Sequence, residues 1–128
     1  MRILGIGVDI IKNNRIKPLI KKKKFLSRTF TKKEIGLSKK LKNKTNYFAK
    51  RFAAKESLSK AIGSGFRNNL SFNDIEILND KMGKPYFKVS NRIDNILKKN
   101  FKLKRYDLFL SISDEKDYSV AFTILQNI

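Results

Sequence analysis

Two acidic side chains stand at positions where the neighbouring residues are apolar. Asp9 interrupts the run from Ile6 to Ile11, and an unpaired carboxylate is costly to bury, so Asp9 requires a cation, hydrogen-bond donors or solvent. Glu56 follows Phe48 and Phe52 at four-residue spacing, which places the three side chains on one face of a helix. Two such carboxylates are candidate ligands for Mg²⁺, which takes one or two carboxylates and completes its shell with water and phosphate oxygens.

Each of these features also has a purely structural interpretation. Asp9 can end a strand by accepting backbone N–H groups, and Glu56 can pair with Lys60, one helical turn further along. The segment Gly63-Ser64-Gly65 permits close approach of a ligand, whereas Gly63 alone is an ordinary helix stop. The residues by themselves leave these alternatives open.

The composition narrows the chemistry that the chain can perform. Its 128 residues fit one domain spanning residues 1–128. The absence of cysteine and histidine excludes a disulfide scaffold, a thiolate metal site and imidazole catalysis. No apolar run approaches the ~18–20 residues of a membrane span. The short apolar start is closed by Asp9 and is not typical of a signal sequence, so we expect a cytoplasmic protein.

The formal net charge of +19 is concentrated in the first half of the chain. Residues 1–60 carry 19 of the 30 Lys and Arg residues but only three of the 11 acids. Such a field attracts anionic partners, including nucleic acid, an anionic membrane or an acidic protein. A lysine-rich coding bias accounts for individual lysines but not for the scarcity of acids. A small basic nucleic-acid-binding module is therefore an alternative function, favoured also by aromatic residues among the basic ones.

The elements that position these residues alternate between helical and extended patterns. Thr31 and Glu34 have the spacing of a capping box and predict a short helix that ends near Leu41. Hydrophobic periodicity and turn residues predict further helices at residues 15–25, 47–62 and 91–99, and strands at residues 3–11, 72–78, 85–89, 107–113 and 118–125. The pattern predicts an α+β fold, with a mainly antiparallel sheet packed with helices.

Four blocks of sequence, taken in order, resemble the bacterial holo-(acyl-carrier-protein) synthases, the short class of 4′-phosphopantetheinyl transferases. The blocks are GIGVDI at residues 5–10, FAAKES with its flanks at residues 48–65, GKP at residues 83–85, and LSISDE at residues 110–115 with Tyr118 beyond. The resemblance covers nearly the whole chain and implies the 4′-phosphopantetheinyl transferase fold.

The family reaction moves the 4′-phosphopantetheine arm of coenzyme A (CoA) to a serine of apo acyl carrier protein in fatty acid biosynthesis. It depends on Mg²⁺ and releases adenosine 3′,5′-bisphosphate. The resemblance implies metal ligands at Asp9 and Glu56 and catalytic roles for Glu56 and Lys60. Either Glu56 or a metal-bound water takes the serine proton. Many relatives have histidine where this chain has Asp114, and the role of Asp114 is open.

The resemblance also implies contacts with both substrates and with other copies of the chain. The basic first helix is expected to dock the acidic carrier protein through Arg15, Lys21 and Lys22. The enzyme is expected to be a homotrimer whose active sites are shared between neighbouring subunits. Contacts with CoA are expected at Arg51, Lys55, Gly63, Ser64, Gly65, Gly83 and Pro85.

Overall fold

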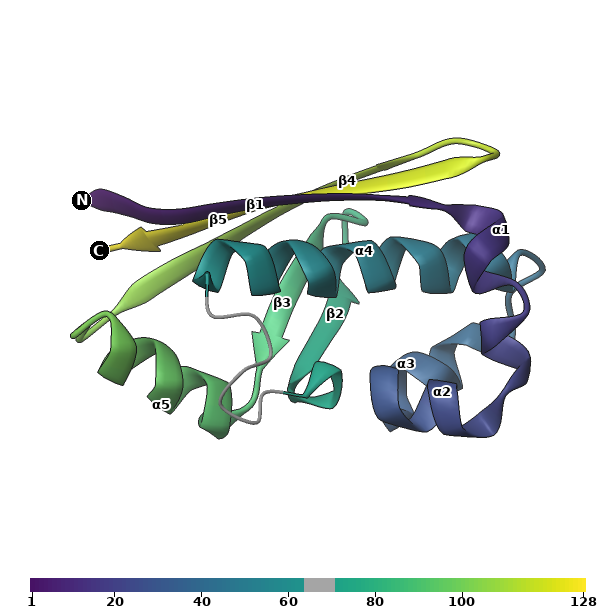
Figure 1. Cartoon of the computed structure of the whole chain (residues 1–128), viewed down its shortest axis with the longest axis horizontal. Helices are drawn as coiled ribbons and strands as arrows, with labels where there is room; N and C mark the ends of the chain where they lie inside the picture. The colour runs from purple at the N-terminus through teal and green to yellow at the C-terminus, as the bar shows by residue number, and fades with distance from the viewer. Residues whose placement is uncertain (64–70) are drawn as a thin grey trace.

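A long helix, α4 (Lys44–Ile62), runs through the middle of the molecule in the computed structural model, which describes residues 1–63 and 71–128. Before it come β1 (Arg2–Lys12), α1 (Asn13–Ile16), the 3₁₀ helix η1 (Leu19–Lys21), α2 (Lys23–Thr29) and α3 (Lys32–Ser38). After it come the 3₁₀ helix η2 (Phe72–Asp74), β2 (Ile75–Asn79), β3 (Pro85–Val89), α5 (Asn91–Asn100), β4 (Tyr106–Asp114) and β5 (Tyr118–Asn127). Figure 1 shows α4 beneath the sheet of β1, β5 and β4, with α2 and α3 near one end and α5 near the other.

The strands form two antiparallel units. β5 lies between β1 and β4 in a three-stranded sheet, and β2 and β3 form a separate hairpin. The pairing places Asp9 opposite Ala121, so Asp9 lies within β1 and not at its end. The expected class of helices with antiparallel strands is confirmed, with the strands divided between two sheets.

Two glycines allow β1 to lie directly against α4. A Cβ atom at Gly7 would stand 1.9 Å from the carbonyl oxygen of Ser57, and one at Gly5 would stand 1.9 Å from that of Ala61. Both distances are far below van der Waals contact, so only glycine fits at either position. Because side chains alternate along a strand, Asp9 points to the same side as the two glycines, toward α4.

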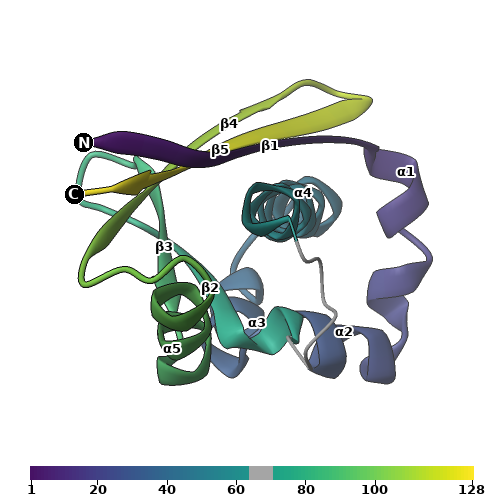
Figure 2. The same cartoon turned by 60° about the vertical axis from the view of Figure 1, so that its left-hand side comes forward.

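The core lies on both sides of α4. One cluster joins α4 to the sheet, the β2–β3 hairpin and α5, and includes Leu58, Ile77 and Leu125. A second, largely aromatic cluster joins the first half of α4 to α1–α3, around Phe30 and Phe48. Figure 2 shows α4 nearly end-on, with neighbours on several sides, which explains why the helix has no single apolar stripe.

Local structure departs from the sequence prediction in three places. The helix expected at residues 15–25 is divided into α1, η1 and α2, because Pro18 lacks the N–H group that a continuous helix would need. α4 begins at Lys44, with Asn43 as its cap. The strand expected from residue 72 begins only after η2. The capping box of Thr31 and Glu34 is confirmed.

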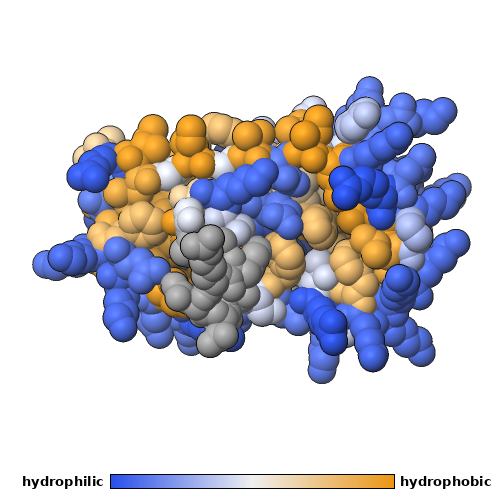
Figure 3. Space-filling view, viewed as in Figure 1, coloured by the Kyte–Doolittle hydropathy of each residue, from blue (hydrophilic) through white to orange (hydrophobic). Residues whose placement is uncertain are grey.

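The face of the three-stranded sheet that points away from α4 is apolar, and we call it the outer sheet face. It carries Ile6, Val8 and Ile10 from β1, together with Phe109 and Phe122, each between 40% and 66% exposed. Figure 3 shows hydrophobic side chains in a row along β1 and hydrophilic ones gathered over α1 and α2. No helix within the described residues is long and apolar enough to cross a membrane.

Candidate functional site

Asp9 and Glu56, the acidic pair, lie where β1 crosses α4. Asp9 is held in β1 and is 18% exposed at its side chain, and Lys60 of α4 donates to its Oδ1 at 3.1 Å and to the carbonyl oxygen of Val8 at 3.0 Å. Lys60 therefore pairs with Asp9, across the helix–strand contact, and not with Glu56 as a simple helix pair would. The half-buried Glu56 is one turn before Lys60 on the same helix face.

The acidic pair is electrostatically coupled. Burial raises the pKa of Glu56 above its ordinary value of 4.5, the negative charge of Asp9 raises it further, and the positive charge of Lys60 lowers it. Because each negative charge makes ionisation of the other carboxylate less favourable, the pair favours a cation between them. Within the described residues no third Asp or Glu joins the pair, so most positions around a cation would be left for water and phosphate oxygens.

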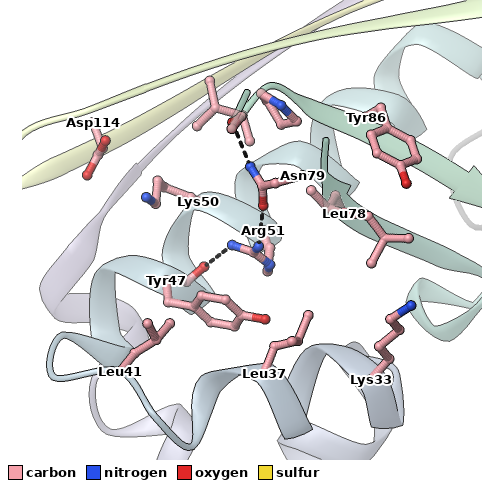
Figure 4. Close-up of a pocket in the computed structure, with 14 residues that line it drawn as sticks. Lys33, Leu37, Leu41, Tyr47, Lys50, Arg51, Leu78, Asn79, Tyr86 and Asp114 are labelled. Atoms are coloured by element: carbon pink, nitrogen blue, oxygen red, sulfur yellow. Dashed lines mark hydrogen bonds between the residues drawn. The ribbon is translucent and has the colours of Figure 1, made fainter. Parts of the chain in front are cut away.

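A cavity of about 650 Å³, here the β2–α4 pocket, opens on another side of α4. Its walls come from α3, α4, the β2–β3 hairpin and the end of β4, as the close-up in Figure 4 shows. Among the described residues, three cations line it, Lys33, Lys50 and Arg51, against one carboxylate, Asp114. The surplus of positive charge suits the pocket to an anionic ligand.

Arg51 is the buried cation of the β2–α4 pocket, with 7% of its surface exposed. Its Nη2 donates to Oδ1 of Asn79 at 3.0 Å, and its guanidinium lies 3.7 Å from the centre of the Tyr47 ring. Asn79 is itself fixed because its Nδ2 donates to the carbonyl oxygen of Gly83 at 2.9 Å, across the hairpin turn. Burial lowers the pKa of Arg51, and interactions with Tyr47 and Glu34 oppose this shift. The Nε of Arg51 has no partner within the described residues.

The acidic pair and the β2–α4 pocket face different directions. Glu56 is five positions after Arg51 on α4, which turns their side chains about 140° apart around the helix axis. Neither Asp9 nor Glu56 lines the pocket. One chain therefore presents two separate charged sites, one acidic and one basic.

The structure brings some of the predicted site residues together and separates others. Asp9, Glu56 and Lys60 form one group, and Arg51, Gly83 and Pro85 line the β2–α4 pocket. Gly63 ends α4 with φ +85° and is exposed beyond the acidic pair, which fits an ordinary helix stop. The predicted contacts at Ser64 and Gly65 lie outside the described residues.

Lys55 lies in the protein interior. It is fully buried, and its Nζ donates to Oε1 of Glu34 at 2.6 Å, to the carbonyl oxygen of Thr29 at 2.8 Å and to that of Phe72 at 3.1 Å. Burial lowers its pKa to about 8, opposed by the negative charge of Glu34. All three N–H groups are occupied, so the predicted contact of Lys55 with CoA does not agree with the structure.

The predicted docking residues Arg15, Lys21 and Lys22 are exposed on and beside α1 and η1. Sequence reasoning missed Tyr47, Lys50 and Asn79, which complete the walls around Arg51. The spacing of Tyr47 and Arg51 on one helix face was the available signal, whereas nothing in the local sequence points Asn79 toward α4.

Comparison with known proteins assigns the class. A sequence model of the 4′-phosphopantetheinyl transferase superfamily matches residues 5–123, so the chain belongs to this superfamily. Its relatives include the holo-(acyl-carrier-protein) synthases of Pelagibacter ubique, 57% identical over 126 residues and 98% of each chain, and of Orientia tsutsugamushi, 46% identical over 96% of each chain. The resemblance identified from the sequence blocks is thereby confirmed.

Solved structures of such enzymes have the same fold. The holo-(acyl-carrier-protein) synthase of Neisseria meningitidis superimposes with a TM-score of 0.87 at 37% identity, over 98% of this chain and 100% of that chain. The enzyme of Bacillus anthracis, solved in complex with CoA (3′,5′-ADP), superimposes with a TM-score of 0.82 at 39% identity, over 98% of each chain.

Proposed function

We propose that this chain transfers the 4′-phosphopantetheine arm of CoA to a serine hydroxyl of apo acyl carrier protein. The serine oxygen forms a new bond to the β-phosphorus of the CoA diphosphate, and the bond from that phosphorus to the bridging oxygen breaks, which releases adenosine 3′,5′-bisphosphate. The observation that carries the proposal is the coupled acidic pair in a strongly basic protein. Membership of the transferase superfamily supports the same reaction.

Asp9 and Glu56 would hold the Mg²⁺ that the family reaction requires. Their coupled charges and the lack of a third acid within the described residues fit a metal that binds phosphate and water in its remaining positions. When bound, Mg²⁺ neutralises charge on diphosphate oxygens. Lys60, 54% exposed at its side chain, is placed to neutralise a further phosphate oxygen, and Glu56 is a candidate to accept the serine proton.

The β2–α4 pocket would bind the nucleotide end of CoA. The unpartnered Nε of Arg51 and the neighbouring Lys50 offer donors and positive charge for a phosphate group. Gly83 and Pro85 form the opposite wall, as the resemblance implied. A relative crystallised with CoA (3′,5′-ADP) supports this ligand.

A homotrimer with shared active sites would unite two half-sites, the acidic pair of one chain and the β2–α4 pocket of the next. CoA carries a diphosphate at the 5′ position of its ribose and a separate phosphate at the 3′ position, whereas the acidic pair and the β2–α4 pocket of one chain face apart. The exposed apolar residues of the outer sheet face supply a surface that another copy can cover. Each active site would then take its acidic pair from one subunit and its pocket from the next.

The basic surface of α1–α2 would dock the acidic carrier protein. Arg15, Lys21 and Lys22 are all exposed there, and Figure 3 shows the hydrophilic side chains gathered at that end. Charge of one sign over a surface raises association rates with a partner of opposite charge. The resemblance also assigns the reaction to fatty acid biosynthesis in the cytoplasm, and this assignment stays a prediction.

The decisive experiment is a transfer assay with mass spectrometry. Wild-type protein, apo carrier protein, CoA and Mg²⁺ should yield a carrier heavier by one phosphopantetheine group, and an excess of chelator should abolish the product. Asp9→Asn should also yield none while retaining a wild-type circular dichroism spectrum. Absence of product from folded wild-type protein and a competent carrier would contradict the proposal and favour the nucleic-acid-binding alternative.

A further inference from the structure

Glu34 is a fully buried acid that the proposed chemistry does not use. Its Oε1 accepts from the backbone N–H of Thr31 at 2.9 Å and from Lys55 at 2.6 Å. Its Oε2 accepts from the backbone N–H of Ile77 at 3.0 Å, and its carbonyl oxygen accepts from the hydroxyl of Tyr47 at 2.7 Å. One residue thus joins α3, α4 and β2.

These partners form the walls of the β2–α4 pocket. Tyr47 and Ile77 both line the pocket. Arg51 rests on the Tyr47 ring, and Asn79, two residues after Ile77, accepts from the same guanidinium. In Figure 4, Tyr47, Arg51 and Asn79 follow one another across the cavity. Glu34 therefore bonds Tyr47 directly and reaches Asn79 through Ile77, although it does not line the pocket itself.

A helix cap alone does not explain a glutamate at this position. A capping box needs one side-chain acceptor at the third helical residue, and glutamine serves as well as glutamate. Glu34 uses its second oxygen on Ile77, which is 43 residues away in the chain. A glutamine has only one acceptor oxygen, so it cannot accept from Thr31 and Ile77 in the same geometry.

Lys55 makes the burial of Glu34 possible. A lone buried carboxylate would be strongly destabilising, and Lys55 supplies the opposite charge while its other two N–H groups reach backbone carbonyl oxygens. Lys55 immediately precedes Glu56 in α4. The ion pair thus connects the pocket walls to the helical turn that carries the acidic pair.

We propose that Glu34 is a positioning residue for the nucleotide end of CoA: its carboxylate fixes Ile77 and its backbone carbonyl oxygen fixes Tyr47, and these two contacts hold the walls that aim Arg51 into the β2–α4 pocket. The inference rests on the proposed function, because it takes the pocket to be the CoA subsite. A residue with a merely structural role would affect stability alone, and a positioning residue also affects the affinity of the pocket.

The test uses adenosine 3′,5′-bisphosphate as a probe of the pocket in the intact protein. Glu34→Gln combined with Lys55→Met removes both buried charges, which avoids an unpaired ion, yet leaves one of the two backbone N–H groups without its acceptor. We expect its dissociation constant for the probe and its KM for CoA to rise about tenfold, the effect of leaving one buried N–H group without an acceptor. Its KM for the carrier protein should stay at the wild-type value.

Two further variants make the result specific. Tyr106→Phe is the stability control, since it removes the 2.7 Å hydrogen bond to Asp94 outside the pocket and should leave probe affinity unchanged. Tyr47→Phe keeps the ring under Arg51 but loses the bond to the backbone carbonyl oxygen of Glu34, and it tests the Tyr47 contact should the paired variant not fold. We expect about a threefold weaker affinity from this single lost bond.

The outcomes separate the two proposals. Weaker probe binding by the paired variant, with unchanged carrier KM, supports the positioning role. Wild-type affinity in the paired variant, or in Tyr47→Phe where the paired variant does not fold, while Arg51→Ala abolishes binding, would overturn the role of Glu34 and leave the CoA pocket intact. Failure of the wild-type protein or insensitivity to Arg51→Ala would overturn the pocket assignment, and the positioning role with it.

Discussion

Arg51 lies face-on over the ring of Tyr47, with its guanidinium 3.7 Å from the ring centre, and both residues belong to one face of α4. The stacking holds a buried cation at the floor of a cavity where it would otherwise be costly to keep charged. It leaves the Nε of Arg51 without a partner in the described part of the chain. The guanidinium of Arg51 is therefore preorganised to bind an anion.

Replacing Arg51 by lysine should weaken CoA binding although the charge is kept. Lysine has no planar group to stack on Tyr47, and its single ammonium cannot also bond both Asn79 and a phosphate, so we expect the KM for CoA to rise about tenfold or more. Steady-state kinetics at saturating carrier protein provide the measurement. Arg105→Lys, at an exposed position outside the β2–α4 pocket, is the matched control, and equal effects of the two changes would contradict the prediction.

The raised pKa of Glu56 makes a prediction about pH. Burial and then the charge of Asp9 raise this pKa above 4.5, so the folded state binds more protons than the unfolded state above pH 4.5. Ionisation of Glu56 therefore lowers the free energy of unfolding as pH rises from 4.5 through its folded pKa. Asp9→Asn removes one cause and should lower the pKa of Glu56, as followed by carbon NMR titration of the side-chain carboxyl.

Binding of Mg²⁺ should lower the pKa of Glu56, as Asp9→Asn should. A metal ion bound by Asp9 and Glu56 competes with the proton, so saturating Mg²⁺ should lower the pKa of Glu56 and reduce the loss of stability on ionisation. Activity should fall on the acidic side as Glu56 takes up a proton. A pKa of Glu56 that does not respond to Mg²⁺ would contradict the shared metal site.

The sequence alone predicts the elements that rest on local signals. The capping box of Thr31 and Glu34, the apolar strand around Asp9 and the two closing strands β4 and β5 all depend on neighbours in the chain, and each is confirmed. Pro18 is the exception: its missing N–H divides the expected helix into three short elements, although the basic residues there remain exposed.

Features that depend on contacts across the fold are harder to predict. Lys55 sits in a block of cations beside Glu56, so its sequence context points to a ligand, yet the fold places it in the interior against Glu34. Asn79 ends β2, and it accepts from Arg51 only because the β2–β3 hairpin packs beside α4. Both outcomes depend on residues more than 20 positions apart in the chain, which no local pattern encodes.

Charge reversal on the basic surface should impair carrier docking selectively. Lys21→Glu with Lys22→Glu removes attraction to an acidic carrier, so we expect its KM to rise about tenfold at low salt, with a weaker dependence on salt than the wild type has. The KM for CoA should be unchanged. Lys99→Glu with Lys104→Glu alters the net charge equally at exposed positions near α5, which Figure 1 shows far from α1. Equal effects of the two double variants would contradict a localised docking surface.

Alanine substitution should have opposite effects on the free energy of unfolding at two glycines, Gly7 and Gly36. A Cβ at Gly7 would lie 1.9 Å from the carbonyl oxygen of Ser57, so Gly7→Ala forces β1 away from α4 and should lower the free energy of unfolding by about 3 kcal/mol or more. The acidic pair spans this contact, and activity should fall with stability. Gly36 lies in α3, and beyond its own helix no atom of the described residues would come within 4 Å of a Cβ there, so Gly36→Ala should stabilise the protein by about 0.5–1 kcal/mol. Urea denaturation measures both.

Complementation between two inactive variants tests whether neighbouring subunits share an active site. Asp9→Asn destroys the acidic pair and Arg51→Ala destroys the pocket, so each variant alone should be inactive. When the two are denatured, mixed in equal amounts and refolded into trimers, some junctions join an intact acidic pair to an intact pocket. Random assembly gives this arrangement at about a quarter of the junctions in a cyclic ring, and we expect about a quarter of the wild-type activity.

The matched control for complementation carries the same two substitutions in one chain. A variant carrying both Asp9→Asn and Arg51→Ala, refolded with an equal amount of wild type, places intact and damaged half-sites in the same ring, and a quarter of its junctions should likewise be intact. Val8→Lys, on the outer sheet face, puts a charge where another copy is proposed to pack and should lower the mass measured by light scattering from three chains to one. Active monomers, or a mixture of the single variants with no activity although it forms trimers, would contradict shared sites, because a complete site within each subunit could not be rescued by its neighbour.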